Sequence, residues 1–396
     1  MKWNSIILII TCLISYSIQI DNGLGLTPAM GWNSWNFYGC NINEEVIKKT
    51  ADLMVSKGLK DAGYEYLNLD DCWQMSRDEN GRIVEDKEKF PSGMKELGKY
   101  IHSKGLKFGI YSSAGTKTCQ GRPGSLYYED IDAQTYAEWE VDYLKYDNCH
   151  NQGIPSTERY PKMTNALKKA GRPIYYSICQ WGEEKIATWG SKYSNSWRTR
   201  LDISNNWESF ILILDQQQGL EKYAGPGGWN DPDMLEVGND GFTLAEAKSH
   251  FVLWAVLKAP LILGNDLSNM SPEILQLLTN DKIIKVNQDK KGKQAKRIKR
   301  DAHIVSGYLD YYVGELERNT WVVVYHNRSK ENVTMELFFK EFDFPGLGGD
   351  IVDIINKNNI GYTTDSYSVE VESHGVFAYT IHLYCGEGEN CKKFLE

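Results

Sequence analysis

Short apolar runs alternate with amphipathic stretches from about residue 27 to residue 290. Each apolar run ends in a polar or glycine-rich cluster, as buried strands commonly do, and the pattern predicts eight strands. The predicted strands are Ala29–Trp35, Tyr64–Asp70, Lys107–Tyr111, Val141–Tyr146, Ile174–Cys179, Ser194–Trp197, Gly225–Trp229 and Leu261–Gly264. The pattern is weakest for the sixth and the seventh of them.

Helical patterns lie between the predicted strands. Asn43 is a suitable N-cap for the first helix, because apolar residues follow it on one helical face. The predicted helices are Glu44–Lys57, Gly93–Ser103, Asp132–Trp139, Lys162–Ala170, Trp207–Gln217, Leu244–Leu257 and Pro272–Val286. Strand and helix that alternate eight times favour an α/β fold of the (β/α)8 TIM-barrel type over an open sheet, and the length of the region suits such a barrel.

The pattern changes after about Gln294, where strand-like segments replace the alternation of strand and helix. The segments are Ile304–Tyr312, Thr320–Asn327, Val333–Phe339, Asp350–Asn356 and Ser366–His382. Several alternate apolar and polar residues, which predicts a C-terminal antiparallel β-sandwich beside the barrel. We interpret the basic run from Lys290 to Arg300 as a linker with a solvated face. The predicted boundaries are 18–293 for the barrel and 294–396 for the β domain.

The N-terminus has the pattern of a secretory signal peptide. Lys2 precedes an apolar run from Ile6 to Ile14, and small polar residues follow up to Ser17. An uncleaved anchor is the alternative, but this run is short for a bilayer and no later segment approaches 18 uninterrupted apolar residues. We therefore expect a signal peptide over residues 1–17 and a secreted or lysosomal protein, free of the membrane after signal removal.

Passage through the secretory route makes the cysteines candidates for disulfides. Cys12 is among the 8 cysteines and leaves with the signal peptide, so an odd number remains and at least one thiol is free. Three N-x-S/T sequons are candidate glycosylation sites, at Asn269, Asn327 and Asn332.

Composition excludes several classes of function. The net charge of −9 disfavours nucleic acid as a partner, because its binders need basic patches. The chain has only 7 histidines, and neither an H-x-x-x-H nor a C-x-x-C spacing occurs. Phosphate-binding glycine loops and the G-x-S-x-G motif are also absent. We therefore expect no metal and no cofactor; the oligomeric state stays open, with a homodimer as one candidate.

Polar side chains gather where the predicted barrel strands end, and this face of such barrels carries the active site. They are Trp35, Asp70, Asp71, Tyr111, Lys145, Asp147, Cys179, Trp181, Arg198, Asp202, Asp231 and Asp233. Any one aspartate could be a turn former, but carboxylates together with Trp, Tyr, Lys and Arg at one mouth indicate a pocket for a small polyol. Glycoside hydrolysis needs two carboxyl groups, and this set can supply them.

The same strand ends closely resemble glycoside hydrolase family 27, which contains α-galactosidases and α-N-acetylgalactosaminidases. The matching stretches include TPAMGWNSWNFYGC, DAGYEYLNLDDCW, YLKYDNC, AGPGGWNDPDM and APLILGNDL, in order between residues 27 and 289. The resemblance covers essentially the whole predicted barrel. It implies a (β/α)8 barrel followed by an antiparallel β domain, and a carbohydrate substrate.

The resemblance also implies roles for individual residues. Asp147 matches the nucleophile and Asp202 the acid/base of a retaining double displacement. The residues that match contacts to galactose are Trp35, Asp70, Asp71, Tyr111, Cys119, Lys145, Cys179, Trp181, Arg198, Asp233 and Met234. Cys40 matches a partner of Cys72, and Cys119 a partner of Cys149. The two departures from the family pattern are Gln180, where Glu is common, and Ser113, where Asp is common.

The electrostatic demands on the two aspartates differ. Lys145 precedes Asp147 by two residues, so both side chains leave the same strand face, and we expect its charge to favour an ionised nucleophile. Asp202 must hold a proton; a negative Asp147 would raise the pKa of Asp202, whereas Arg198 would lower it.

The alternative functions are an α-N-acetylgalactosaminidase, a non-catalytic galactose-binding protein and a transglycosylase. We favour hydrolysis of terminal α-galactose, because both catalytic aspartates are present and Trp181 should fill the space that an N-acetyl group needs. The sequence leaves open whether the substrates are oligosaccharides, galactomannans or glycolipids.

Overall fold

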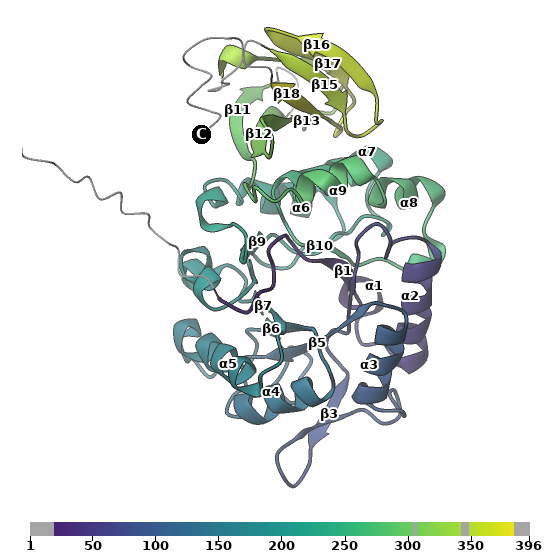
Figure 1. The fold of residues 1–396 in the computed structure, drawn as a ribbon, viewed down its shortest axis with the longest axis vertical. Coiled ribbons are helices and arrows are strands. Elements are labelled where there is room, and N and C mark those ends of the chain that lie inside the picture. The colour runs from purple at the N-terminus through teal and green to yellow at the C-terminus, as the bar shows by residue number, and fades with distance from the viewer. Residues whose placement is uncertain (1–19, 304–306, 342–347, 384–396) are drawn as a thin grey trace, which may run out of the picture.

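Eight parallel strands form the barrel in the computed structural model, which describes residues 20–303, 307–341 and 348–383 (Figure 1). The strands are β1 (Met30–Asn33), β2 (Tyr66–Asn68), β5 (Lys107–Ser113), β6 (Tyr143–Asp147), β7 (Tyr175–Cys179), β8 (Ser196–Arg198), β9 (Trp229–Asp231) and β10 (Leu261–Leu263). Their order is β10-β1-β2-β5-β6-β7-β8-β9, and Leu235, just after β9, pairs with Leu263 of β10 to close the ring. All eight predicted barrel strands are present. The predicted signal peptide lies outside the described residues.

Helices surround the barrel (Figure 1). They are α1 (Trp35–Tyr38), α2 (Glu44–Ser56), α3 (Met94–Ser103), α4 (Glu129–Glu138), α5 (Ser156–Ala170), α6 (Trp207–Asp215), α7 (Leu244–Val256), α8 (Pro272–Leu278) and α9 (Asp281–Asn287). Short 3₁₀ turns are η1 (Glu183–Thr188), η2 (Gly190–Lys192), η3 (Glu221–Tyr223), η4 (Leu267–Asn269) and η5 (Phe339–Glu341). Asn43 caps α2 as predicted, accepting from the Val46 N–H at 2.8 Å. In the described part of the chain, no helix has both the length and the apolar character to cross a bilayer.

Several barrel elements differ from the prediction. Helix α5 begins at Ser156 rather than Lys162, and Trp35 begins α1 rather than ending a strand. The single helix predicted over Pro272–Val286 is two helices. Helix α8 ends at Leu278, and the side-chain oxygen of Asn280 caps α9 by accepting from the Lys282 N–H at 3.0 Å. The Asn280 amide also donates to the backbone of the β domain. The strand predicted from Gly225 begins only at Trp229, because Gly225 and Gly228 pair with each other in a tight turn.

An aromatic layer fills the end of the barrel where the strands begin. Tyr66, Tyr143 and Tyr175 are the first residues of β2, β6 and β7, and all three are buried. The rings of Tyr143 and Tyr175 stack with centroids 4.8 Å apart. Met234 and Ile262 belong to the same buried cluster. The barrel interior is therefore closed below the face that carries the strand ends.

The C-terminal domain is a β-sandwich. One sheet has the order β11-β12-β13-β18-β15-β16, and β14 pairs with β17 in the other. The strands are β11 (Lys296–Ala302), β12 (Tyr308–Leu316), β13 (Thr320–Asn327), β14 (Val333–Phe338), β15 (Gly349–Asp353), β16 (Asn359–Thr363), β17 (Ser366–Val371) and β18 (Val376–Leu383). A separate hairpin of β3 (Gln74–Arg77) and β4 (Ile83–Glu85) extends from the barrel. Inward side chains of both sheets, such as Val323 and Met335, share one apolar core. This confirms the predicted antiparallel domain, but the segment predicted as Ser366–His382 is two strands, β17 and β18. The first residues of the segment predicted as Ile304–Tyr312 lie outside the described residues.

The basic run is not the solvated linker that we predicted. Its second half forms β11, and its arginines enter an ion-pair cluster that joins the two domains. Asp215, at the end of α6, accepts from Arg300 at 2.6 Å, from Arg297 at 2.8 Å and from Arg328 at 2.9 Å. Arg300 and Arg328 also bind the buried carboxylate of Asp310 on β12. The positive residues of β11 therefore bind the barrel to the sandwich.

Replacing Asp215 by Asn should weaken the protein at neutral pH and have little effect in strong acid. Hydrogen bonds from Arg328 and Arg300 outweigh partial burial and lower the pKa of Asp215 to about 2. A depressed folded-state pKa gives stability that is present above roughly pH 4 and is lost as pH falls through about 2. We expect a loss of about 1–3 kcal/mol in the free energy of unfolding at pH 7, measured by urea titration. Asp130→Asn, in an exposed pair with Lys169, is the matched control, and an equal loss for Asp215→Asn at pH 7 and pH 2 would contradict the assignment.

The three predicted glycosylation sequons differ in exposure. Asn269 in η4 and Asn332 before β14 are exposed. Asn327 is fully buried at the end of β13, and its Nδ2 atom donates to the carbonyls of Glu331, Val371 and Glu372. Nδ2 is the atom that would carry the sugar, so the folded chain leaves no place for a glycan there. Asn269 and Asn332 remain predicted glycosylation sites, whereas the engaged amide of Asn327 argues against a glycan there.

Candidate active site

A cavity opens at the carboxyl ends of the barrel strands. It is lined by Trp35, Asn36, Asp70, Asp71, Tyr111, Cys119, Lys145, Asp147, Arg198, Asp202, Ile203, Asp233 and Met234. Tyr111 and Lys145 lie within β5 and β6, and the other residues end or follow β1, β2, β5, β6, β8 and β9. Closure of the barrel brings them together. Eleven of the thirteen predicted catalytic and substrate-binding residues line this cavity, and Cys179 and Trp181 do not.

Asp147 is buried at the end of β6, deep in the cavity. The Tyr111 hydroxyl donates to its Oδ2 atom and the Asn148 N–H to its Oδ1 atom, each at 2.8 Å. Burial raises the pKa of Asp147 to about 6, although the charge of Lys145 and these two hydrogen bonds oppose the shift. Lys145 acts in the predicted direction, but desolvation is larger. The carboxylate is therefore held in one orientation and is more basic than an exposed aspartate.

Asp70 and Asp71 lie side by side on the cavity wall after β2. Lys145 and Asn33 each donate to Asp70 Oδ2 at 2.8 Å. Asp71 accepts from the Gln120 N–H at 2.9 Å, and burial raises the pKa of its carboxyl group. These contacts fix two adjacent acceptors and one ammonium donor on one side of the cavity, which suits neighbouring hydroxyl groups of a sugar.

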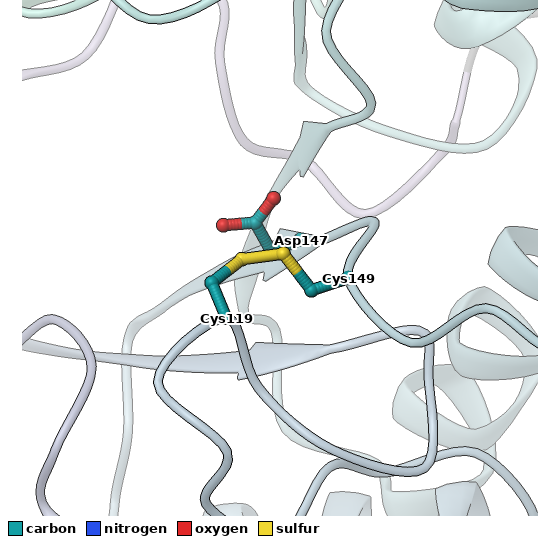
Figure 2. Close-up of side chains that lie close together, drawn as sticks. All are labelled: Cys119, Asp147 and Cys149. Atoms are coloured by element: carbon teal, nitrogen blue, oxygen red, sulfur yellow. A yellow bond between two sulfur atoms is a disulfide. The ribbon is translucent and has the colours of Figure 1, made fainter.

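Two disulfides join the loops around the cavity. Cys40 and Cys72 link the loops after β1 and β2, and Cys119 and Cys149 link those after β5 and β6, as predicted. Figure 2 shows the second disulfide beside the Asp147 carboxylate, and the two sulfurs and a carboxylate oxygen lie within 4.8 Å of one another. Because both sulfurs are in the disulfide, this group offers no thiolate to a metal.

Arg198 links two carboxylates on the opposite wall. Its Nη2 atom lies 2.9 Å from Asp202 Oδ1 and 2.9 Å from Asp233 Oδ2. Asp233 is buried, which raises its pKa to about 6 against the charge of Arg198, and its backbone is left-handed at φ 106°. The Asp202 side chain is 69% exposed, and Arg198 outweighs desolvation and lowers the pKa of Asp202. The two predicted catalytic carboxyls therefore face one cavity from different depths.

Cys179 and Trp181 lie apart from this arrangement. Cys179 is a buried free thiol that lines a chamber deeper in the barrel, where its sulfur accepts from Arg198 at 3.5 Å. Trp181 is half-buried and is absent from the lining of both the cavity and the chamber. Our reason for expecting Trp181 to fill the space of an N-acetyl group therefore has no support in this geometry.

The two residues that depart from the family pattern, Gln180 and Ser113, make hydrogen bonds that hold neighbouring segments together. Gln180 is buried and donates to Ser156 Oγ at 3.2 Å, while Ser113 donates to the Cys149 carbonyl at 2.9 Å. Neither lines the cavity. Conversely, Asn36 and Ile203 line it but were missed. Each of them follows a predicted site residue, Trp35 or Asp202, and this was the only sign in the sequence that they could line the cavity. The sequence does not show which residues beside a site residue point their side chains into the cavity.

Comparisons with known proteins agree with this geometry. Residues 27–289 match the family described as Alpha galactosidase A, and residues 306–381 match the Alpha galactosidase C-terminal beta sandwich domain. The alpha-galactosidase of Coffea arabica is 51% identical over 368 residues, which are 92% of this chain and 95% of that protein. The crystal structure of alpha-galactosidase I from Mortierella vinacea has a TM-score of 0.89 at 39% identity, covering 93% of this chain and 100% of that chain. The structure of the Saccharomyces cerevisiae alpha-galactosidase with raffinose has a TM-score of 0.89 at 32% identity, covering 92% of this chain and 99% of that chain. The chain therefore belongs to the alpha-galactosidase family, glycoside hydrolase family 27.

Proposed function

We propose that this glycoside hydrolase, an α-galactosidase, releases terminal α-linked galactose by double displacement with net retention. One observation carries the proposal. Asp147, held rigidly at the base of the cavity, and Asp202, exposed at its mouth, line the same cavity from opposite walls. A nucleophile and a proton donor on opposite sides of a scissile bond are what this mechanism requires.

The first step forms a covalent galactosyl-enzyme. Asp70, Asp71 and Lys145 bind the hydroxyls of galactose and place its anomeric carbon over Asp147. An Asp147 oxygen bonds to that carbon, the glycosidic carbon–oxygen bond breaks, and Asp202 gives its proton to the departing oxygen. In the second step a water molecule gives a proton to Asp202 and attacks the same carbon, and the bond to Asp147 breaks. Two inversions at one carbon leave the configuration unchanged.

The proton on Asp202 needs an explanation, because Arg198 lowers the pKa of Asp202 in the free protein. The leaving group must lie over the exposed Asp202 side chain, and we propose that it displaces water there and raises the pKa of Asp202. Asp233 also competes for the charge of Arg198 at the same 2.9 Å distance. Once Asp147 is esterified, its negative charge is gone, the pKa of Asp202 falls, and Asp202 can act as a base towards water.

Retention can be tested by following hydrolysis of 4-nitrophenyl α-galactoside by proton NMR. We expect α-galactose to appear first, with β-galactose growing in later through mutarotation. Initial release of β-galactose would overturn the double displacement. The N-acetyl analogue, run in parallel, tests the alternative α-N-acetylgalactosaminidase activity; the relatives named alpha-galactosidase support slower cleavage of this analogue.

The predicted signal peptide over residues 1–17 supports entry into the secretory route, with delivery outside the cell or to the lysosome. The two disulfides fit an oxidising compartment, and Asn269 and Asn332 are accessible for glycans. Galactosides of oligosaccharides, galactomannans and glycolipids are the substrate classes that we propose.

A further inference from the structure

Asn36 lines the active-site cavity and is held by a buried carboxyl group behind it. Its Nδ2 atom donates to Glu236 Oε1 at 2.7 Å, and Asn239 Nδ2 donates to Glu236 Oε2 at 2.6 Å. Glu236 is 3% exposed, and it lies on the loop after β9, whereas Asn36 is in α1 after β1. Three side chains, one from α1 and two from the loop after β9, therefore form one hydrogen-bonded chain that ends at the cavity.

The surroundings leave Asn36 little freedom. A Cβ atom placed on Gly264, after β10, would lie 2.9 Å from the Cβ atom of Asn36, so a glycine is needed for this close approach. Because Nδ2 is bound to Glu236, the amide cannot rotate by half a turn without losing that bond and placing its oxygen against the carboxyl group. The other end of a planar amide points away from its bound nitrogen. Among the described residues Oδ1 has no hydrogen-bond donor, so it is the acceptor that a lining Asn36 can offer to the cavity.

The depth of the lining residues indicates which part of a substrate this acceptor meets. The residues around Asp147, such as Asp71 and Tyr111, are almost completely buried, and in the proposed function they enclose the sugar that is cleaved off. Asn36 is only partly buried, and Asp202, which faces the leaving oxygen, is exposed. Trp35 and Lys145 are partly buried as well, so the placement of Asn36 rests on its neighbours. Glu236, which holds Asn36, lies on the same loop as Asp233, and Asp233 accepts from the Ile203 N–H beside Asp202 at 2.8 Å. Asn36 is therefore linked to the wall that carries Asp202, where the leaving group would lie.

We infer that Asn36 selects for sugar leaving groups: its Oδ1 atom accepts a hydrogen bond from a hydroxyl of the sugar to which galactose is attached, and Glu236 is the residue that positions it. This inference rests on the proposed function. Burial raises the pKa of Glu236 to about 7, chiefly by desolvation, and the two amide donors stabilise its charged form. The inference rests on the geometry of these two contacts and not on the titration of Glu236.

The experiment compares kcat/KM for a galactosyl-α-1,6-glucose disaccharide with kcat/KM for 4-nitrophenyl α-galactoside, whose leaving group has no sugar hydroxyls. We expect Asn36→Ala to lower the ratio of the two values by about 3–10-fold, mainly through KM for the disaccharide, as one neutral hydrogen bond predicts. The matched control is Asn358→Ala, an exposed asparagine in the β domain, which should leave the ratio at the wild-type value. A ratio that Asn36→Ala does not change would overturn the inference.

The role of Glu236 has its own test. Glu236→Gln places an amide between two asparagine amides, so one donor faces another donor, and the ratio should fall as for Asn36→Ala. In the double variant Glu236→Gln with Asn36→Asp, the new glutamine amide donates to the new aspartate, so the hydrogen bond forms again with donor and acceptor exchanged. The second aspartate oxygen can still accept a hydrogen bond from the substrate. The ratio should therefore return to within about 2-fold of wild type. A double variant as poor as Glu236→Gln alone would overturn the positioning role. Failure of the proposed function is distinguishable, because it would show in the anomer released from the nitrophenyl substrate by the wild-type chain.

Discussion

The Asp147→Asn variant should bind galactose but release almost none from any galactoside. An amide cannot form the galactosyl ester, so kcat is expected to fall by ~10⁴-fold or more, for both nitrophenyl and sugar leaving groups. The carboxamide has the same shape and can still accept from the Tyr111 hydroxyl, which now reaches it at 2.8 Å. The fold and the walls that hold the sugar should survive. Initial rates and a galactose-dependent rise in Tm together measure the two effects.

Rescue by azide tests the same assignment independently. In Asp147→Ala the side chain is short enough for azide to reach the anomeric carbon from the nucleophile's side. We expect partial recovery of nitrophenol release with 4-nitrophenyl α-galactoside, and β-galactosyl azide as the product. Asp130→Asn, an exposed aspartate of α4, should behave as the wild type. Normal turnover by Asp147→Asn would show that another group is the nucleophile.

The loss in Asp202→Asn should depend on the leaving group. A sugar alkoxide needs a proton to depart, so kcat/KM for galactosyl-α-1,6-glucose is expected to fall by about 10²–10⁴-fold. Nitrophenolate leaves without a proton, so kcat/KM for the nitrophenyl substrate should fall far less. Water then attacks the intermediate without a base, and stopped-flow measurements should show a burst of nitrophenolate before a slow steady rate.

The configuration of the azide product distinguishes the role of Asp202 from that of the nucleophile Asp147. Azide needs no base, and it should accelerate the Asp202→Ala variant and yield α-galactosyl azide, with the configuration retained. An equal loss for both leaving groups, or a β-azide product, would contradict the acid/base assignment of Asp202.

Local patterns were sufficient to predict the barrel, because its strands are buried runs whose polar residues sit at one end. The polar residues at the strand ends also predicted most of the cavity lining. The barrel closes where Leu235 pairs with Leu263, and closure places all of the strand ends around one opening. The helix predicted over Pro272–Val286 was not divided, because apolar residues keep their helical spacing on both sides of Asn280. Asn280 is a good N-cap residue and was the one sign of the break in the sequence.

The remaining errors concern contacts between distant segments. The basic run looked solvated, because its partners Asp215 and Asp310 lie on α6 and β12. Asn327 is a valid sequon whose amide is used by carbonyls up to 45 residues away. Lys145 was expected to keep Asp147 acidic, and only the structure shows how far burial outweighs that charge. Sequence spacing carries no information on desolvation or on pairing between loops.

The tyrosine layer beneath the cavity limits how the enzyme can work on large substrates. Because Tyr66, Tyr143 and Tyr175 seal the barrel below the sugar, a polysaccharide cannot thread through, and only a terminal unit or a single-residue branch can enter. The cut galactose must then leave by the opening through which it arrived, after the trimmed chain has moved away. Free galactose at high concentration will therefore compete with the next chain end, and removal of several units from one chain requires a fresh encounter for each.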